Sequence, residues 1–376
     1  MKNALTLFAF SLALMACGLD SGTVEPTGAP GGSSGSGSGA SPAPSGGSSS
    51  SSGDAGPAIA PGTPITAPNE TWTWIDVPGT ACGDGSPTGV GVNLTDKSDD
   101  VMIFLEGGGA CWDGESCWGV ASTSFYMNGY GATELATDPQ IAAIFTLDRS
   151  DADNPFRDKN LVFVPYCTGD SHSGNAITTL DYAGIAHATH FVGYENLGAD
   201  LSRIIATFPA TKRVWLSGDS AGGFGSAFNF ARVQAAFPGA RVDVLDDSGQ
   251  PIAPDAARWA LWKNAWNMQL PADCPACANG PGAFVDYYAS KFPAHRFGLV
   301  SFDYDTIIAP FMNITLEQFH DELYATLAHV DSSWPSGGYF VLAGASHVGL
   351  ATPTPDLKTW VTKMVTDDPT WSSMKP

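Results

Sequence analysis

One short segment of the chain has the residue types and spacing needed for nucleophilic attack on a carbonyl carbon. An apolar, β-prone run at residues 214–217 leads into Gly-Asp-Ser-Ala-Gly at residues 218–222, and an apolar helical pattern follows. When Gly-x-Ser-x-Gly joins a strand to a helix, the turn is too sharp for flanking side chains, and the serine stands exposed at its tip. We therefore predict that Ser220 is the nucleophile of an acyl transfer.

Such a serine needs a base to take its proton and a carboxylate to orient that base. His347 follows the last predicted strand within a run of small residues, which leaves its ring free to reach the serine. Asp303 and Asp305 follow the strand predicted at residues 297–302, and we prefer Asp305 as the acid. Asp303 stays open, because residues two apart in an extended segment face the same way.

Two other polar loops follow predicted strands. Asp247 comes directly after the strand at residues 241–245, where some hydrolases carry the acid, and it is a further alternative. Asp170 and His172 lie in the loop at residues 166–174 and could line a substrate cleft. His172 precedes the serine in the chain, whereas the usual order places the base after the nucleophile.

A glycine run could stabilise the negative charge that develops on the carbonyl oxygen. The apolar strand predicted at residues 101–105 ends in Glu106 and then three glycines at residues 107–109. Glycines let backbone N–H groups approach a ligand closely, and hydrolases with a serine elbow use the loop after an early strand for this purpose. We expect half of an oxyanion hole here.

These loops require a scaffold that brings them to one edge. Apolar runs without alternation are typical of buried parallel strands, and residues 194–208 have the spacing of an amphipathic helix. Parallel strands deliver their following loops to one edge of the sheet. We predict an α/β fold with a doubly wound, mostly parallel sheet, helices on both faces and a small cap region that contains the tryptophans at positions 259, 262 and 266.

The N-terminal segment indicates export. Residues 1–17 have a short apolar core and a small residue before Cys17, as in a lipoprotein signal, so we expect cleavage there and lipidation of Cys17. An ordinary secretory signal is the alternative. Residues 18–68 are rich in Gly, Ser and Pro and are expected to form a disordered tether, with the catalytic domain at residues 69–376. This predicts a bacterial lipoprotein at the cell surface or on the periplasmic side of the envelope.

The net charge limits the kinds of molecule that this protein is expected to bind. The net charge is −21, of which residues 69–376 carry −19, which argues against binding nucleic acid, anionic lipid or a dense polyanion. We expect a monomer that meets the membrane only through its lipid.

The six cysteines after Cys17 suggest disulfides, and of 15 pairings we favour the local pairs Cys111–Cys117 and Cys274–Cys277, which leave Cys82–Cys167. Half a zinc site or a redox pair at Cys274 and Cys277 is the alternative.

Taken together, these motifs resemble the pectin acetylesterase family, to which animal Notum-type carboxylesterases also belong. The resemblance covers most of residues 82–350 and rests on five ordered segments: residues 104–109 with Cys111, 165–167, 218–223 and 247–249, and the late Asp and His. It implies an α/β-hydrolase-like fold with no metal and no cofactor.

By this resemblance Ser220 is the nucleophile, Asp305 the acid and His347 the base, and N–H groups of Gly108, Gly109 and Ala221 form the oxyanion hole. The family pattern also supports the pairs Cys82–Cys167 and Cys111–Cys117. One departure is that Gly109 stands where many relatives carry Trp, which removes a wall of the acyl pocket.

The implied activity is removal of O-acetyl groups from extracellular polysaccharide, either pectin-like or, given the negative charge, a neutral acetylated glycan. A carboxylesterase or lipid deacylase that acts on longer acyl chains is the first alternative. A non-catalytic surface lipoprotein that binds glycan is the second.

Overall fold

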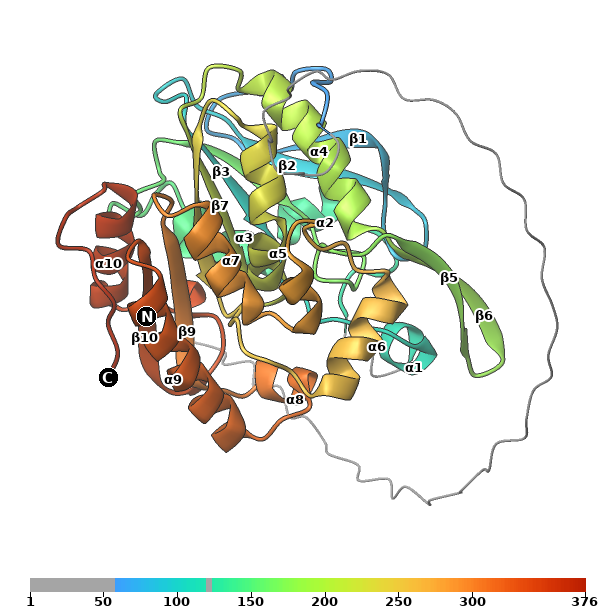
Figure 1. Cartoon of the computed structure of the whole chain (residues 1–376). Helices are drawn as coiled ribbons and strands as arrows, with labels where there is room; N and C mark the ends of the chain where they lie inside the picture. Colours follow the sequence, from blue (N-terminus) through green and yellow to red (C-terminus); the bar gives the residue numbers. More distant parts are fainter. Residues whose placement is uncertain (1–57, 120–123) are drawn as a thin grey trace, which may run out of the picture. The chain divides into compact units, whose positions relative to one another are not determined.

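The computed structural model describes residues 58–119 and 124–376 (Figure 1). Its centre is an eight-stranded sheet with the order β1-β2-β4-β3-β7-β8-β9-β10. Only the β1–β2 and β2–β4 pairs are antiparallel. The strands are Thr73–Ala81 (β1), Pro87–Asn93 (β2), Val101–Leu105 (β3), Asn160–Val164 (β4), Arg213–Asp219 (β7), Arg241–Asp247 (β8), Phe297–Asp305 (β9) and Gly337–Ser346 (β10). The predicted α/β class with a mostly parallel sheet is confirmed.

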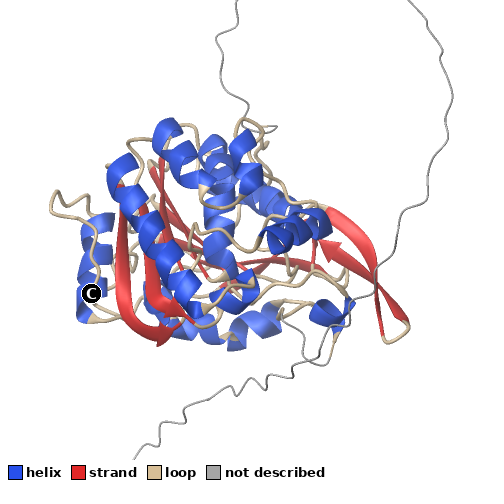
Figure 2. Ribbon diagram, turned by 60° about the horizontal axis from the view of Figure 1, so that its bottom comes forward, coloured by secondary structure: helices blue, strands red, loops and turns tan. Residues whose placement is uncertain are grey.

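Helices cover both faces of this sheet because its central strands are apolar on both sides (Figure 2). All five residues of β3 are buried, and alternate ones contribute to two separate apolar cores. One core includes side chains of α4 (Gly193–Thr207), α5 (Ala221–Ala236), α7 (Ala283–Lys291) and α9 (Leu316–Ser333). The other includes side chains of α2 (Ala132–Thr137) and α10 (Pro355–Val365).

Smaller elements surround the ends of the strands. Strands β5 (Ala176–Tyr182) and β6 (Ile185–Phe191) form a separate antiparallel hairpin that projects beside α1 (Gly114–Trp118), as Figure 1 shows. The remaining short elements are α3 (Pro139–Ala143), η1 (Phe145–Leu147), α6 (Ala256–Trp266), η2 (Pro275–Asn279), α8 (Ile308–Met312) and η3 (Gly349–Ala351).

Three disulfides have the predicted pairing. They join Cys82 to Cys167, Cys111 to Cys117 and Cys274 to Cys277, so the last two cysteines are bonded to each other and are not free to act as metal ligands. The first bond closes a loop of 85 residues. By the loss of entropy in the unfolded chain, a loop of this length stabilises the fold by roughly 4.6 kcal/mol.

The described chain begins before the expected domain boundary. Residues 58–68 lie along α4, where Gly62 N–H donates to the Ser202 carbonyl at 2.8 Å and Ile65 is buried in the core. An apolar residue at position 65 explains why this end of the Gly/Ser/Pro-rich stretch packs on the domain. The expected signal peptide, Cys17 and residues 18–57 lie outside the described residues. Within the part that is described, no helix is long and apolar enough to cross a membrane.

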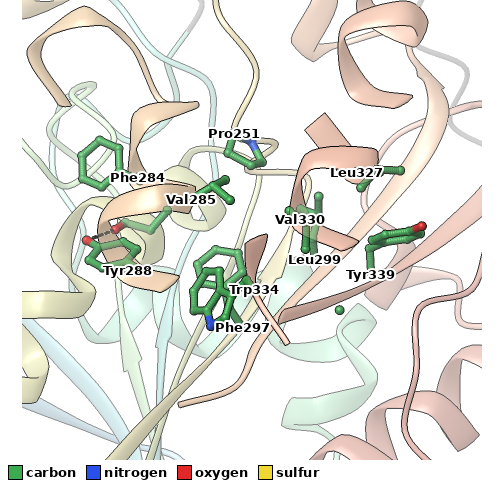
Figure 3. A pocket seen from close by; sticks show the side chains of 12 residues that line it. Pro251, Phe284, Val285, Tyr288, Phe297, Leu299, Leu327, Val330, Trp334 and Tyr339 are labelled. Carbon is green, nitrogen blue, oxygen red and sulfur yellow. Dashed lines mark hydrogen bonds between the residues drawn. The ribbon is translucent and has the colours of Figure 1, made fainter. Parts of the chain in front are cut away.

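The core contains a small apolar cavity of about 20 Å³ between α7, α9 and the strands β9 and β10 (Figure 3). Trp334, Phe284 and Tyr339 are among the side chains that line it, and no charged side chain is. A cavity with such walls usually stays dry. None of the residues predicted to do chemistry lines it.

Candidate active site

The strained turn between β7 and α5 places Ser220 at the carboxyl edge of the sheet. Ser220 has φ 53° and ψ −119°, a conformation that is rare outside glycine and typical of functional sites. A Cβ atom on Gly222 would lie 1.9 Å from the Leu105 carbonyl oxygen, so only glycine fits between the turn and β3. The backbone therefore has the geometry of a nucleophile elbow.

The neighbouring strands β9 and β10 bring a carboxylate and an imidazole together. Their register pairs Ser346 with Asp305, and His347 follows directly. His347 Nδ1 lies 2.7 Å from Asp305 Oδ2. The other oxygen of Asp305 accepts the N–H groups of Ile307 and Ile308, each at 2.9 Å, so this buried carboxylate is held in place. Nε2 is the ring nitrogen left for a proton from a hydroxyl group.

The environment favours a basic His347. Burial of the ring lowers its pKa, but the hydrogen bond to Asp305 and the charges of Asp305, Asp247 and Asp219 together raise the pKa above its usual value. Only 18% of the side chain is exposed. The imidazole is thus a stronger base than a free one and is shielded from bulk water.

The two alternative acids contact backbone groups and not the ring. Asp303 Oδ1 accepts Gly344 N–H at 2.7 Å. The carboxylate of Asp247 accepts Gly349 N–H at 3.1 Å and Leu350 N–H at 2.7 Å. Of the three aspartates weighed from the sequence, the structure pairs Asp305 with His347.

Asp247 instead connects the base loop to the serine. Its carbonyl oxygen accepts Ser220 N–H at 2.8 Å, while its carboxylate holds the two residues that follow Val348. Among the described residues, no hydrogen bond joins the Ser220 hydroxyl to the His347 ring. Catalytic hydrogen bonds often tighten only when substrate binds, and the shared contact through Asp247 keeps both groups at the same edge.

The glycine loop after β3 is held in place by hydrogen bonds, including one from Phe125 N–H to the Gly108 carbonyl, but the N–H groups at its tip are unpaired among the described residues. Gly107 N–H donates to Asp219 Oδ1 at 3.0 Å, and the Gly107 carbonyl accepts Gln140 Nε2 at 3.0 Å. Within the described chain, the N–H groups of Gly108, Gly109 and Ala221 have no acceptor in the protein. Ala221 is the first residue of α5, where N–H groups are unpaired and the helix dipole is positive. These three donors are able to bind an oxyanion.

A cavity of about 20 Å³ begins at Ser220, and most of its lining side chains are apolar. The elbow and the glycine loop form one part of it, and mainly apolar side chains of α5, the cap helix α6 and α8, with Ser171 of the loop after β4, form the rest. Its lining comprises Gly109, Ala110, Ser171, Ser220, Ala221, Phe224, Phe228, Trp262, Trp266, Ile308 and Phe311. Two tryptophans of the predicted cap region, Trp262 and Trp266, thus contribute a wall of this pocket.

Sequence patterns did not identify every residue that lines this pocket. Phe224 and Phe228 of α5 belong to the apolar core and also line the cavity. Their four-residue spacing reports an apolar helix face, and an apolar pocket produces the same pattern as a core. In the loop after β4, Ser171 lines the pocket, a role that no spacing signal indicated.

His172 lies beneath the site instead of lining it. It is 2% exposed, and its Nε2 lies 2.9 Å from the Glu106 carbonyl oxygen, directly before the glycine loop. Burial lowers the pKa of His172 to about 4, so the ring is neutral and donates to that carbonyl. Asp170 is also buried, where it accepts Gly193 N–H at 2.8 Å. No group of three or more potential metal ligands occurs among the described residues.

A serine elbow, an Asp–His pair and free N–H donors at the carboxyl edge of a mostly parallel sheet are the features of an α/β-hydrolase-like protein. Comparison with known families is more specific. Residues 71–260 match the family described as Pectinacetylesterase, and the chain belongs to this family.

Curated relatives carry carboxylesterase names. Palmitoleoyl-protein carboxylesterase notum2 of Xenopus laevis is 30% identical over an aligned length of 248 residues, and the match covers 56% of this chain and 48% of the relative. Palmitoleoyl-protein carboxylesterase NOTUM of Homo sapiens is 30% identical over 185 residues, with 45% and 34% covered, and that of Mus musculus is 32% identical over 178 residues, with 45% and 33% covered. The chain thus spans less than half the length of these relatives.

Proposed function

We propose that this protein is a serine esterase that removes short acyl groups, foremost acetyl, from extracellular polysaccharide. The observation that carries the proposal is the 2.7 Å contact between His347 and Asp305 at the same sheet edge as the strained Ser220. The family match and the carboxylesterase names of the relatives support ester hydrolysis as the reaction class.

The reaction follows from the roles of these groups. His347 Nε2 takes the Ser220 proton as the hydroxyl oxygen attacks the ester carbonyl, and Asp305 offsets the charge of the imidazolium. The N–H groups of Gly108, Gly109 and Ala221 bind the oxyanion, where one such donor is worth about 3 kcal/mol. The imidazolium protonates the departing alcohol, and water, deprotonated by His347, then releases the acid from Ser220.

The size of the pocket supports a short acyl group. A volume of about 20 Å³ is only slightly more than one water molecule requires, so the cavity has room for a methyl group and would have to widen to enclose a long chain. The relatives are named for a palmitoleoyl group, which is far larger. The charge of −19 on residues 69–376 favours a neutral acetylated glycan over a highly charged pectin.

A panel of acetylated plant polysaccharides, with acetate release as the readout, tests the substrate. A fluorophosphonate probe tests the mechanism separately: Ser220 should be labelled, and Ser220→Ala should lose both labelling and hydrolysis. A non-catalytic glycan-binding protein would show neither labelling nor hydrolysis in the wild type, and a long-chain deacylase would release acetate poorly.

We further propose that the protein is an exported lipoprotein and a monomer. The sequence at residues 1–17 supports this localisation. Metabolic labelling with an alkyne fatty acid should mark the wild-type protein and fail on Cys17→Ser. A wild type that is secreted without label would instead indicate an ordinary secretory signal.

A further inference from the structure

The acyl pocket has an indole wall where the glycine loop offers no side chain. Gly109, at φ 85°, lines the cavity without a Cβ atom, and Trp262 and Trp266 of the cap helix α6 line it as well. The two indoles are stacked, with ring centroids 5.4 Å apart and 12° between their planes. The glycine loop has no side chain to form this wall of the pocket, so the cap helix α6 supplies aromatic side chains instead.

Contacts with the segment after the glycine loop fix these indoles. Trp266 Nε1 donates to the Cys111 carbonyl at 2.7 Å, and Cys111 is itself held by its disulfide. The Trp112 ring lies 6.2 Å from that of Trp262 and is covered by the Arg258 guanidinium at 4.1 Å. A substrate could displace this wall only by breaking several contacts at once.

Trp262 is the less constrained of the two rings. The Trp266 indole is fully buried and satisfied by its hydrogen bond, whereas Trp262 Nε1 is buried without a partner among the described residues. Replacing Trp262 therefore breaks no hydrogen bond of its indole among the described residues.

We propose that Trp262 sets the acyl length that the enzyme accepts, and this inference rests on the proposed esterase function. With the indole in place the cavity of about 20 Å³ accepts an acetyl group. Without the indole, the cavity extends toward α6 and admits a longer chain. The site therefore takes short-chain esters, because the Trp262 side chain limits the length of the pocket.

The test measures kcat/KM for p-nitrophenyl acetate, butyrate and octanoate. The octanoate-to-acetate ratio should rise about tenfold or more in Trp262→Ala, since one methylene that gains a hydrophobic contact can raise kcat/KM about tenfold or more. Trp262→Phe keeps an aromatic ring and a stable cap, and it should raise the butyrate-to-acetate ratio a few-fold. This second variant carries the test if the alanine variant fails to fold.

Trp334→Ala is the matched control. Trp334 is also a buried tryptophan with an unpaired indole N–H group, and it lines the separate 20 Å³ cavity of the core (Figure 3). Its removal should lower stability without changing the acyl ratios.

The outcomes separate the two proposals. Unchanged ratios in folded Trp262 variants that still cleave acetate would overturn the role of Trp262 and leave the esterase proposal standing. A wild type that prefers octanoate would overturn the short-acyl pocket. A wild type that cleaves none of the esters and is not labelled at Ser220 would refute the esterase itself.

Discussion

At the scale of single residues, the contact between His347 and Asp305 distinguishes two aspartates that the sequence leaves equivalent. Asp305→Asn should lower kcat about 10⁴-fold with little change in KM, because it stabilises the wrong imidazole tautomer and removes the charge beside it. Asp303→Asn should stay within a few-fold of wild type, since Asp303 bonds only the Gly344 backbone among the described residues. Steady-state kinetics with p-nitrophenyl acetate measures both, and an equally damaging Asp303→Asn would contradict the assignment.

A second prediction at this scale concerns pH. His347 acts as a base only when it is neutral, and its pKa is raised, so kcat/KM should fall with acid from an apparent pKa above about 6.5. The charge of Asp247 contributes to that increase. Asp247→Asn should therefore move the acid limb to lower pH.

The pH readout separates an electrostatic and positioning role of Asp247 from a purely structural one. A lower rate without movement of the limb would show that Asp247 only supports the loop at residues 349–350. Asp303→Asn serves again as the control, because Asp303 is not among the groups that shift the pKa of His347.

The choice between the aspartates could not be made from sequence because it depends on strand register. β9 and β10 pair regularly up to Leu342, and the register then shifts before Ala345. That irregularity sets Ser346 opposite Asp305 and delivers His347 to its carboxylate. Local sequence determines that both aspartates end a strand, but only the pairing of two distant segments determines which one reaches the ring.

At the scale of elements, the elbow strand orients the glycine loop through Asp219. Its Oδ1 accepts Gly107 N–H at 3.0 Å, which fixes the loop one residue before the free donors. Asp219→Ala should lower kcat roughly 10- to 100-fold with a small change in KM, because misplaced donors lose transition-state stabilisation and not substrate binding. Asp219→Asn keeps an acceptor oxygen and should recover much of the rate.

Steady-state kinetics should give kcat and KM separately for both variants. A loss mainly in kcat for Asp219→Ala and its recovery in Asp219→Asn would support the acceptor role of Asp219. If Asp219→Asn were as slow as Asp219→Ala at equal stability, the acceptor role toward Gly107 would be wrong.

The buried strands could be predicted from the sequence, whereas the helix faces that line the pocket could not. The apolar runs that became β3, β4, β7, β8 and β9 were recognisable because a buried parallel strand needs no alternation. The face of α5 that lines the pocket was not recognisable, since Phe224 and Phe228 have the same spacing whether they pack in a core or line a cavity. The position of the α6 indoles opposite a side-chain-free glycine loop depends on tertiary packing, which spacing does not encode.

At the scale of the whole molecule, several carboxyl groups lie inside the protein beneath the catalytic edge. Burial raises the pKa of Asp246 to about 8 and, together with the charge of Asp247, that of Asp219 to about 7. Asp246 Oδ1 accepts Gly249 N–H, whereas its Oδ2 is buried without a partner among the described residues. The fold therefore holds a neutral acid at this position.

These shifts predict that stability declines as the medium becomes alkaline. Between about pH 3.9 and 8 the folded state binds a proton at Asp246 that the unfolded chain has released, so stability falls as pH rises, by up to about 1.4 kcal/mol per pH unit. His172, with a lowered pKa of about 4, acts oppositely below about pH 6.5. The melting temperature should thus fall from pH 6.5 to pH 8.

Asp246→Asn tests the source of that decline, because an amide keeps the acceptor for Gly249 and cannot ionise. Its melting temperature should exceed that of the wild type by several degrees at pH 8, and the difference should shrink toward pH 6.5. Asp321→Asn removes the same formal charge from a side chain that is 85% exposed and should leave the pH dependence unchanged. If both variants changed the profile equally, the decline would come from the overall negative charge of the protein and not from the buried carboxyl group.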